Sequence, residues 1–148
     1  MKITIIDNFI SDEKIDFLLN FYKNNIHLCN KFRDTFPINI TSLFKDLENK
    51  YNNFDKKKCV DWLEIVHWPK GSFQQPHKDF ASEKTVLTSI TYLNEDFIGG
   101  ETVFEDGTMI KPKKGRTLFF DGQYYKHSVN LIEKGNRYTV PVWYKKRI

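Results

Sequence analysis

Two histidines and one aspartate have the residue types and the spacing of a metal site. His77 and Asp79 are separated by one residue in the segment HKDF, and His127 follows fifty positions later. Side chains at positions i and i+2 of an extended segment project to the same side, so His77 and Asp79 can reach one ion together. His127 opens a strand-like segment that can supply the third ligand. Two imidazoles and one carboxylate form the facial set that binds iron(II), although zinc accepts similar donors.

One arginine has the position to complete such a site for an anionic ligand. Arg137 lies ten positions beyond His127 and begins a further strand-like segment. A guanidinium group pairs with a carboxylate through two parallel hydrogen bonds, so Arg137 is a candidate for holding the free end of a dicarboxylate that chelates the metal. An exposed arginine at a strand end would have the same spacing, and spacing alone leaves both interpretations open.

The elements that position these residues follow from the periodicity of apolar side chains. Residues 1–7 have the pattern of a first strand, and Ser11 with the acidic residues after it is a helix start signal. A second helical stripe comprises Ile40, Leu43, Phe44, Leu47 and Tyr51. From about residue 58 the period changes from 3.6 to 2, and we expect strands at 59–68, 85–93, 101–104, 108–111, 116–120, 127–132 and 137–144.

The order of these elements predicts a mainly β architecture. Many short strands separated by turn residues indicate a sandwich, a jelly roll or a barrel, and helices packed outside one sheet would complete a two-layer domain. Segment 59–68 is apolar on both faces, which is typical of a central strand; one face carries Val60, Trp62, Glu64, Val66 and Trp68. The length of 148 residues suits one domain, with 1–57 as helical support and 58–148 as the β core.

Composition limits the classes of protein that the chain can belong to. The apolar share of 40% and the aromatic share of 16% indicate a packed core. No apolar run approaches the ~20 residues of a membrane span, and the amino terminus lacks the pattern of an export signal, so we expect a cytoplasmic protein with no membrane partner. The two cysteines, Cys29 and Cys59, are expected to be free thiols.

The net charge of +4 comes from basic residues that gather in three short stretches of the sequence. Solvated turns explain these stretches, and a nucleic acid or an acidic partner is the alternative that the sequence leaves open. The three stretches are Lys56, Lys57 and Lys58; Lys111, Lys113, Lys114 and Arg116; and Lys145, Lys146 and Arg147.

At the metal-site residues the chain resembles the prolyl 4-hydroxylase-like branch of the 2-oxoglutarate/Fe(II)-dependent oxygenases. The segment WPKGSFQQPHKDF is similar to the family's lead into its first histidine and aspartate, and LTSITYLNEDFIGGETVF, KPKKGRTLFF, HSV and NRYTVPVWY follow in the family's order. The resemblance covers about residues 58–146. It implies a mainly β protein with N-terminal helices, in which a double-stranded β-helix (jelly-roll) core is supported by two or more α-helices.

The resemblance also implies roles for single residues. His77, Asp79 and His127 would be the catalytic iron(II) ligands, and Arg137 would bind the distal carboxylate of 2-oxoglutarate. Tyr92 matches a family tyrosine that reaches the same carboxylate, although it also fits as a plain barrel aromatic. Trp143 would close the wall of this pocket, and core packing explains it nearly as well.

The reaction implied is hydroxylation of an unactivated C–H bond with O2, releasing succinate and CO2, with ascorbate as a candidate reductant. A prolyl residue in a peptide or protein is the first choice of substrate, and a free amino acid or small metabolite is the alternative. A nucleic-acid demethylase would carry a second arginine six residues after Arg137, where this chain has Trp143, so a nucleic-acid substrate is disfavoured. A non-catalytic β-helix binding module or a cupin-like metal protein would not need Arg137, Tyr92 and the Gly-Gly-Glu-Thr segment together.

Two departures from the family pattern bear on the pocket. Trp68 stands where the family usually has tyrosine, which removes a hydroxyl group. Pro141 lies within the last strand, and because proline cannot donate to a sheet ladder we expect that strand to be at an edge, bulged or locally unpaired. The loops Phe80 to Lys84 and Asn94 to Ile98 are candidates for a lid or rim.

Overall fold

The computed structural model describes residues 2–79 and 82–148, and most elements in this part of the chain are β-strands. The helices are α1 (Asp12–Asn24), α2 (Lys45–Asn52) and the short 3-10 helix η1 (Ile26–Leu28). The strands are β1 (Thr4–Ile6), β2 (Phe36–Asn39), β3 (Lys58–Trp68), β4 (Gln74–His77), β5 (Leu87–Tyr92), β6 (Ile98–Gly99), β7 (Thr102–Phe104), β8 (Met109–Ile110), β9 (Thr117–Phe120), β10 (His127–Val129), β11 (Ile132–Lys134) and β12 (Arg137–Lys146).

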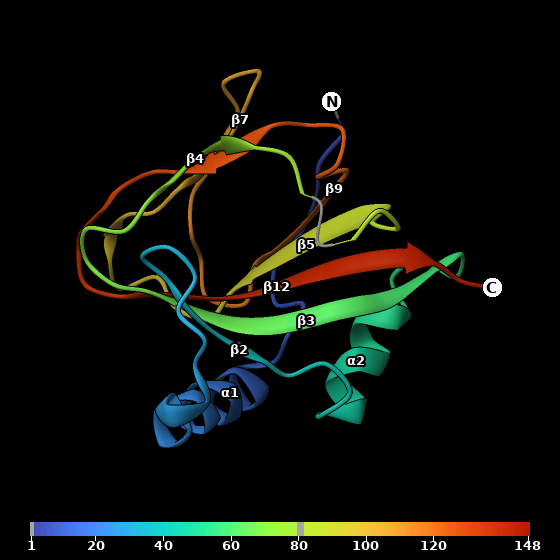
Figure 1. Cartoon of the computed structure of the whole chain (residues 1–148), viewed down its shortest axis with the longest axis horizontal. Coiled ribbons are helices and arrows are strands. Elements are labelled where there is room, and N and C mark those ends of the chain that lie inside the picture. The colour runs from blue at the N-terminus through green and yellow to red at the C-terminus, as the bar shows by residue number, and fades with distance from the viewer. Residues whose placement is uncertain (1, 80–81) are drawn as a thin grey trace.

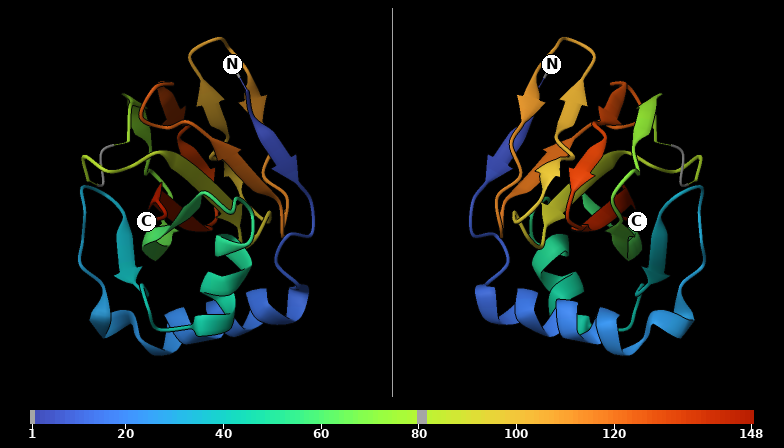
Figure 2. Two further views of the ribbon diagram at one scale, coloured as in Figure 1. Left: turned by 90° about the vertical axis from the view of Figure 1, so that its right-hand side faces the viewer. Right: turned by 90° about the vertical axis from the view of Figure 1, so that its left-hand side faces the viewer.

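These strands form two main antiparallel sheets and one small pair. The larger sheet has the order β1-β9-β5-β12-β3-β2, the smaller has the order β4-β10-β7-β8, and β6 pairs with β11. In Figure 1 the smaller sheet lies above the larger one, and α1 and α2 lie below it. Both side views in Figure 2 place the two helices on the same outer face of the larger sheet. The chain is therefore mainly β with antiparallel sheets, as the sequence predicts.

Helix α1 begins where its capping residue Ser11 predicts. The Ser11 side chain accepts a hydrogen bond from the backbone N–H of Lys14 at 3.2 Å, and acidic residues occupy the first turn. Its apolar stripe packs on the larger sheet, where it joins a core cluster with residues of β3 and β12. The buried helix and sheet residues of this cluster include Ile15, Leu18, Tyr22, Leu47, Tyr51, Leu63, Ile65, Val140 and Val142.

The predicted second helix starts too early in the sequence. The stripe begins at Ile40, but α2 begins only at Lys45, and residues 36–39 form β2 beside β3. The backbone N–H of Ile40 bonds to the carbonyl of Leu63 at 2.9 Å, which extends the sheet contact beyond β2. Ser42 has a φ of 65°, a conformation that a right-handed helix cannot contain. Pairing with β3 therefore overrides the helical pattern before residue 45.

Strand β3 is a central strand, as its two apolar faces predict, because it lies between β12 and β2. Leu63 and Ile65 face the helices and belong to the core beneath the sheet. Val66 and Trp68 belong to a separate cluster with Val129 and Ile132 from the opposite side. Trp62, Glu64, Val66 and Trp68 line the cavity between the two sheets, as the alternation predicts. Val60 was expected on the same face but packs against the core on the helix side, because the register of β3 with β12 shifts between Trp62 and Val60.

Of the three alternatives expected from Pro141, an edge position is excluded because β12 lies between β5 and β3, and local loss of pairing is what the structure shows. Its pairing with β3 passes from Thr139, opposite Val66, to Val142, opposite Leu63, with no partner on β3 for the two residues between them. A register shift follows between Trp143 and Tyr144. The strand thus accommodates proline by a local gap in one ladder while the pairing with β5 continues.

The fold also bears on three smaller features of the sequence: the cysteines, the basic stretches and the lack of a membrane span. Cys29 and Cys59 are free thiols. The first and third basic stretches of the sequence come together, because Lys58 pairs with Lys146 across β3 and β12. Across residues 2–79 and 82–148, every helix is too short or too polar to cross a membrane.

Candidate metal centre

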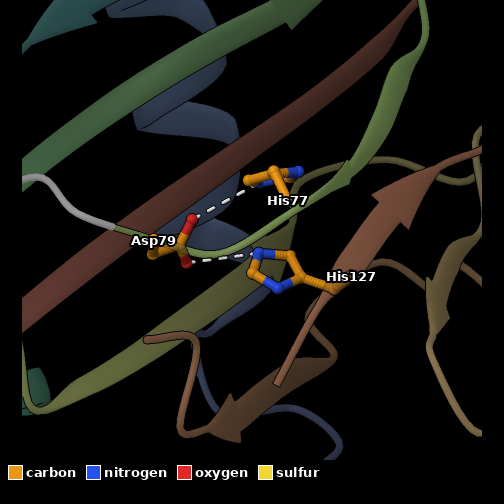
Figure 3. A group of neighbouring side chains, drawn as sticks. All are labelled: His77, Asp79 and His127. Atoms are coloured by element: carbon orange, nitrogen blue, oxygen red, sulfur yellow. Dashed lines mark ion pairs between the residues drawn. The ribbon is translucent and has the colours of Figure 1, made fainter. Parts of the chain in front are cut away.

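His77, Asp79 and His127 converge on one point between the two sheets. His77 ends β4, His127 begins β10, and the two residues are directly paired across these strands. Nε2 of His77 lies 3.4 Å from Oδ1 of Asp79, and Nε2 of His127 lies 3.2 Å from Oδ2. Figure 3 shows the three side chains pointing toward one another. One potential ligand atom from each residue lies within 4.8 Å of the others, a spacing that one metal ion can bridge.

The Nδ1 atoms of both imidazoles are hydrogen-bonded to backbone carbonyl oxygens. Nδ1 of His77 lies 2.9 Å from the carbonyl oxygen of Gln75, and Nδ1 of His127 lies 3.0 Å from that of Tyr125. A carbonyl oxygen only accepts, so Nδ1 is the protonated nitrogen in each ring. In the neutral imidazole, Nε2 then carries a lone pair directed at the centre. This arrangement fixes the tautomer and the ring orientation that metal binding requires.

Asp79 supplies the negative charge of the group. Its side chain is 8% exposed, and Oδ2 has no hydrogen-bond donor among the described residues. Burial raises the pKa of Asp79, but contacts with His127 and His77 in their protonated forms lower it by more, so the net pKa lies below the usual range for aspartate. A metal ion would take the place of those protons. An ionised carboxylate and two imidazole lone pairs then meet at one point. A divalent cation satisfies all of them, so the residues present fit such an ion.

The loop after β9 determines where Asp79 lies. The backbone N–H of Asp79 donates to the carbonyl oxygen of Gly122 at 2.7 Å. A Cβ atom at Gly122 would come within 2.5 Å of Oδ2 of Asp79 and would also collide with Thr88. Gly122 is therefore required for close approach, and its backbone conformation is one that other residues also adopt. The sequence predicts only a turn at this position.

Arg137 is a buried cation without a carboxylate partner. Its side chain is 1% exposed, and it forms no ion pair with any described carboxylate. Nε donates to the carbonyl oxygen of Gly100 at 3.0 Å, and the guanidinium lies 4.7 Å from the ring centre of Trp68. Burial lowers the pKa of Arg137, although an arginine remains charged at neutral pH. A buried and unpaired charge of this kind is costly unless a ligand completes it.

Tyr92 and Thr102 support this arginine from the other side. The guanidinium of Arg137 lies 5.4 Å from the ring centre of Tyr92. The Tyr92 hydroxyl shares a hydrogen bond of 2.6 Å with the Thr102 hydroxyl, which also accepts a longer bond of 3.4 Å from Arg137. A Cβ atom at Gly100 would press on Cδ of Arg137, so the glycine allows the side chain to lie there. Thr102 and Gly100 belong to the Gly-Gly-Glu-Thr segment, whose contact with Arg137 spacing alone does not reveal.

A cavity of about 730 Å³ joins the metal centre to Arg137. His77, Asp79, His127, Arg137 and Trp143 all line it, whereas Tyr92 is not among the lining residues. The predicted site residues therefore come together, with Tyr92 behind Arg137. Trp68 also lines the cavity, and its indole N–H is buried without a hydrogen-bond partner among the described residues. The replacement of tyrosine by tryptophan thus leaves a donor in place of a hydroxyl group.

The rim of the cavity differs from the rim that the sequence predicts. Residues 94–98 do not line the cavity, and Phe80 and Ala81 lie outside the described residues. The loop 30–35 lines it instead, together with Pro37 and Asn39 of β2. A hydrogen bond from the Phe73 N–H to Oδ2 of Asp34 connects this loop to the segment before β4. This contact spans 39 positions of sequence and has no local signal.

Comparison with known proteins agrees with this geometry. The model of the 2OG-Fe(II) oxygenase superfamily matches residues 63–145, which is more than half of the chain. Among curated proteins, prolyl 3-hydroxylase 2 of Homo sapiens is 36% identical over 64 residues, which cover 38% of this chain and 9% of that protein. The chain therefore spans less than a tenth of the length of the curated relatives it matches.

Solved structures with the same fold include two prolyl hydroxylases. The viral collagen prolyl hydroxylase of Paramecium bursaria Chlorella virus-1, solved with 2-oxoglutarate, has a TM-score of 0.72 and 22% identity and covers 100% of this chain and 97% of that chain. The prolyl hydroxylase of Trichoplax adhaerens, solved with a peptide of the hypoxia inducible factor, has a TM-score of 0.74 and 18% identity, with 97% and 83% covered. The family match and the shared fold lead to one conclusion: the chain belongs to the 2OG-Fe(II) oxygenase superfamily.

Proposed function

We propose that the chain is a 2-oxoglutarate-dependent dioxygenase that hydroxylates a prolyl residue in a peptide or protein. The observation that carries this proposal is the buried guanidinium of Arg137, which has no anionic partner in residues 2–79 and 82–148 and lines the same cavity as His77, Asp79 and His127. A metal-binding module or a zinc hydrolase has no need of that cation. A dicarboxylate that chelates the metal at one end and meets Arg137 at the other uses every one of these groups.

Each residue then has a defined part in the reaction. His77, Asp79 and His127 would hold iron(II), with the backbone carbonyls of Gln75 and Tyr125 orienting the two imidazoles. Iron(II) with 2-oxoglutarate supplies the oxidation, in which one atom of O2 enters succinate with loss of CO2 and the other enters a C–H bond of the substrate.

The residues around Arg137 position the co-substrate and exclude water from it. Arg137 binds the distal carboxylate, and the bonds to Gly100 and Thr102 hold the guanidinium at a fixed depth. Trp68 packs against the guanidinium within the cavity, and Tyr92, which does not line the cavity, packs against the guanidinium as well. Exclusion of water from this end of the cavity strengthens the pairing of guanidinium and carboxylate.

Two observations support a peptide as the substrate. The similar proteins are prolyl hydroxylases by name, and one of them was solved with a peptide bound. The cavity rim in this chain carries exposed aromatic side chains, Phe32 and Phe73, that suit contact with an extended chain. We also infer that the two facing sheets correspond to the double-stranded β-helix of the family.

Anaerobic titration tests the metal and co-substrate. Iron(II) should give a weak visible charge-transfer band only after 2-oxoglutarate is added, and the band should be lost in Asp79→Ala and His127→Ala. With ascorbate as reductant, air should then produce succinate in the unaltered protein alone. A band in both variants, or none in the unaltered protein, would contradict the assigned ligands.

A library of proline-containing peptides tests the substrate. Mass spectrometry should detect the gain of one oxygen atom on proline in some of the peptides, and omission of 2-oxoglutarate should abolish it. If every peptide stays unmodified while a free amino acid or another metabolite is oxidised, the peptide assignment is wrong and the dioxygenase assignment stands.

A further inference from the structure

One end of the cavity combines two tryptophans with a carboxylate. Trp62, Glu64 and Trp143 line this end, beside Asn39 of the edge strand β2 and Pro141 of β12. The indole Nε1 of Trp62 donates to Oε2 of Glu64 at 2.8 Å, which holds the carboxylate beside the ring. None of these contacts involves the metal ligands or Arg137. This end of the cavity is therefore a separate feature that the proposed reaction does not explain.

The strand register places this feature beside the metal centre. Trp143 pairs with Trp62 on β3 and with Thr88 on β5, and Thr88 lies next to Asp79 across Gly122. Neighbouring strands are about 4.8 Å apart, so Trp62 lies about 10 Å from Thr88 across the sheet. Arg137 pairs with Trp68, six residues farther along β3. Trp62 and Trp143 are thus displaced along the sheet from Arg137, and Trp143 is the one of the two that neighbours Thr88 beside the metal centre.

Glu64 carries a charge that no described residue neutralises. It forms no ion pair in the described part of the chain, although two cations lie on the nearby loop. Lys31 lies over the ring of Phe36 at 5.8 Å, and Arg33 lies over the ring of Phe32 at 5.4 Å. Burial raises the pKa of Glu64, opposed by the hydrogen bond from Trp62, so desolvation disfavours the bare anion. A cation placed beside the carboxylate would offset that cost.

The combination of groups defines the ligand that fits. Indole rings attract cations through their faces, and a carboxylate supplies the opposite charge and two acceptors. An ammonium or guanidinium group is matched by both, whereas a carboxylate or phosphate is repelled by Glu64. An apolar side chain would bury the carboxylate without an opposite charge beside it.

We propose that Trp62, Glu64 and Trp143 form a subsite for a positively charged side chain of the substrate, so that the preferred peptide carries Lys or Arg next to the hydroxylated residue. This inference rests on the proposed function, because it takes a peptide as the substrate. Adjacent Cα atoms are about 3.8 Å apart, and a lysine or arginine side chain extends several ångströms farther. A neighbouring basic residue can therefore span the ~10 Å that separate Trp62 from Thr88, the residue next to Asp79.

Binding of short peptides tests the subsite without any turnover. All three tryptophans of the chain line the cavity, so intrinsic fluorescence reports on its occupancy. The probes are acetylated Gly-Pro-X-Gly and Gly-X-Pro-Gly amides with Lys, Gln or Glu at X, added anaerobically to protein loaded with iron(II) and 2-oxoglutarate. In the better of the two orders, the Lys peptide should bind about tenfold more tightly than the Gln peptide, and the Glu peptide more weakly still.

Two variants separate the subsite from a general effect on the protein. Glu64→Gln should bind the Lys and Gln peptides equally and keep the charge-transfer band with 2-oxoglutarate. Glu133→Gln, an exposed glutamate on β11 that does not line the cavity, should keep the tenfold preference. If Glu64→Gln fails to fold, Trp62→Leu takes its place and should show a reduced preference, with binding measured by calorimetry.

The outcomes distinguish the subsite from the reaction. Equal binding of Lys and Gln peptides in the unaltered protein, or a preference that survives Glu64→Gln, overturns the subsite even if proline is hydroxylated. Selective binding of the Lys peptide that depends on Glu64, with no oxygen added to proline in air, supports the subsite and overturns prolyl hydroxylation. Selective binding together with hydroxylation supports both.

Discussion

At the scale of single residues, two positions make the site specific for its ligands. Arg137 provides the only buried guanidinium among the described residues, and Gly122 provides the space in which Asp79 lies against Thr88. The first residue acts through its charge and the second through the absence of a side chain. Substitutions at these positions therefore separate co-substrate binding from metal binding.

Replacement of Arg137 by leucine should weaken 2-oxoglutarate binding by about 10- to 100-fold, because a charge-assisted pair with a carboxylate contributes about 1.5–3 kcal/mol. The fold should persist, since an apolar side chain removes the cost of burying a charge. The apparent affinity for 2-oxoglutarate, followed by the charge-transfer band, measures the effect. Arg116→Leu, which breaks an ion pair with Asp7 away from the cavity, is the matched control. Equal affinities in the two variants would refute the role of Arg137.

Replacement of Gly122 by alanine should weaken metal binding while the fold remains. The added Cβ atom collides with Oδ2 of Asp79 and displaces that carboxylate from the two imidazoles. We expect at least a tenfold loss of affinity, the lower end of the range for residues that orient metal ligands. Calorimetric titration with Mn²⁺ measures it. Gly107→Ala is the control, because its Cβ meets no atom within 4 Å and only its φ of 90° is strained.

At the scale of elements, the start of helix α1 is determined by residues that are neighbours in the sequence. Helix α1 starts at a serine cap, and its start is predicted by Ser11 together with the acidic residues Asp12 and Glu13. Ser11→Ala should lower the free energy of unfolding by about 1 kcal/mol, and Ser11→Asp should retain it, because aspartate also accepts the bond from the Lys14 N–H. Urea denaturation measures both variants. An unchanged free energy of unfolding in Ser11→Ala would show that the cap contributes nothing.

Helices and strands could be predicted from the sequence where the apolar residues keep one periodicity along the whole element. Strands β3, β5 and β12 lie where alternation places them, and the histidine and aspartate ligands follow from their spacing on extended chain. The start of α2 could not be predicted, because pairing of residues 36–39 with β3 overrides a helical stripe. The loop 30–35 and the contact of Gly100 with Arg137 depend on neighbours that are distant in sequence. Local patterns carry no signal for such contacts.

At the scale of the whole molecule, the metal centre connects the two sheets. His77 and His127 lie on the smaller sheet, while Asp79 is bonded to the loop that leaves β9 of the larger one. A bound ion therefore adds a link between layers that otherwise meet through side-chain packing and a few hydrogen bonds, such as that between Tyr92 and Thr102. The unfolded chain cannot present the same three ligands together, so the ion binds the folded state selectively.

Metal binding should accordingly stabilise the fold. At a concentration of Mn²⁺ that is 100 times its dissociation constant, the free energy of unfolding should rise by about 2.7 kcal/mol. Differential scanning calorimetry with and without the ion measures this rise. In Asp79→Asn the rise should disappear, whereas Glu133→Gln should behave as the unaltered protein does. A rise of equal size in Asp79→Asn would mean that Mn²⁺ binds elsewhere.

Backbone hydrogen bonds of strand β12 to both neighbouring strands fix the position of Arg137 in the cavity. Arg137 is the first residue of this ten-residue strand, which is bonded on both sides, and the metal ligands belong to the facing layer. Neither Arg137 nor the metal centre can shift without movement of a sheet. The distance between them should therefore be nearly constant, whichever diacid binds. An oxo diacid with one methylene fewer or one more than 2-oxoglutarate should accordingly bind more weakly. We therefore expect the length of the carbon chain to determine which diacid binds as the proposed co-substrate.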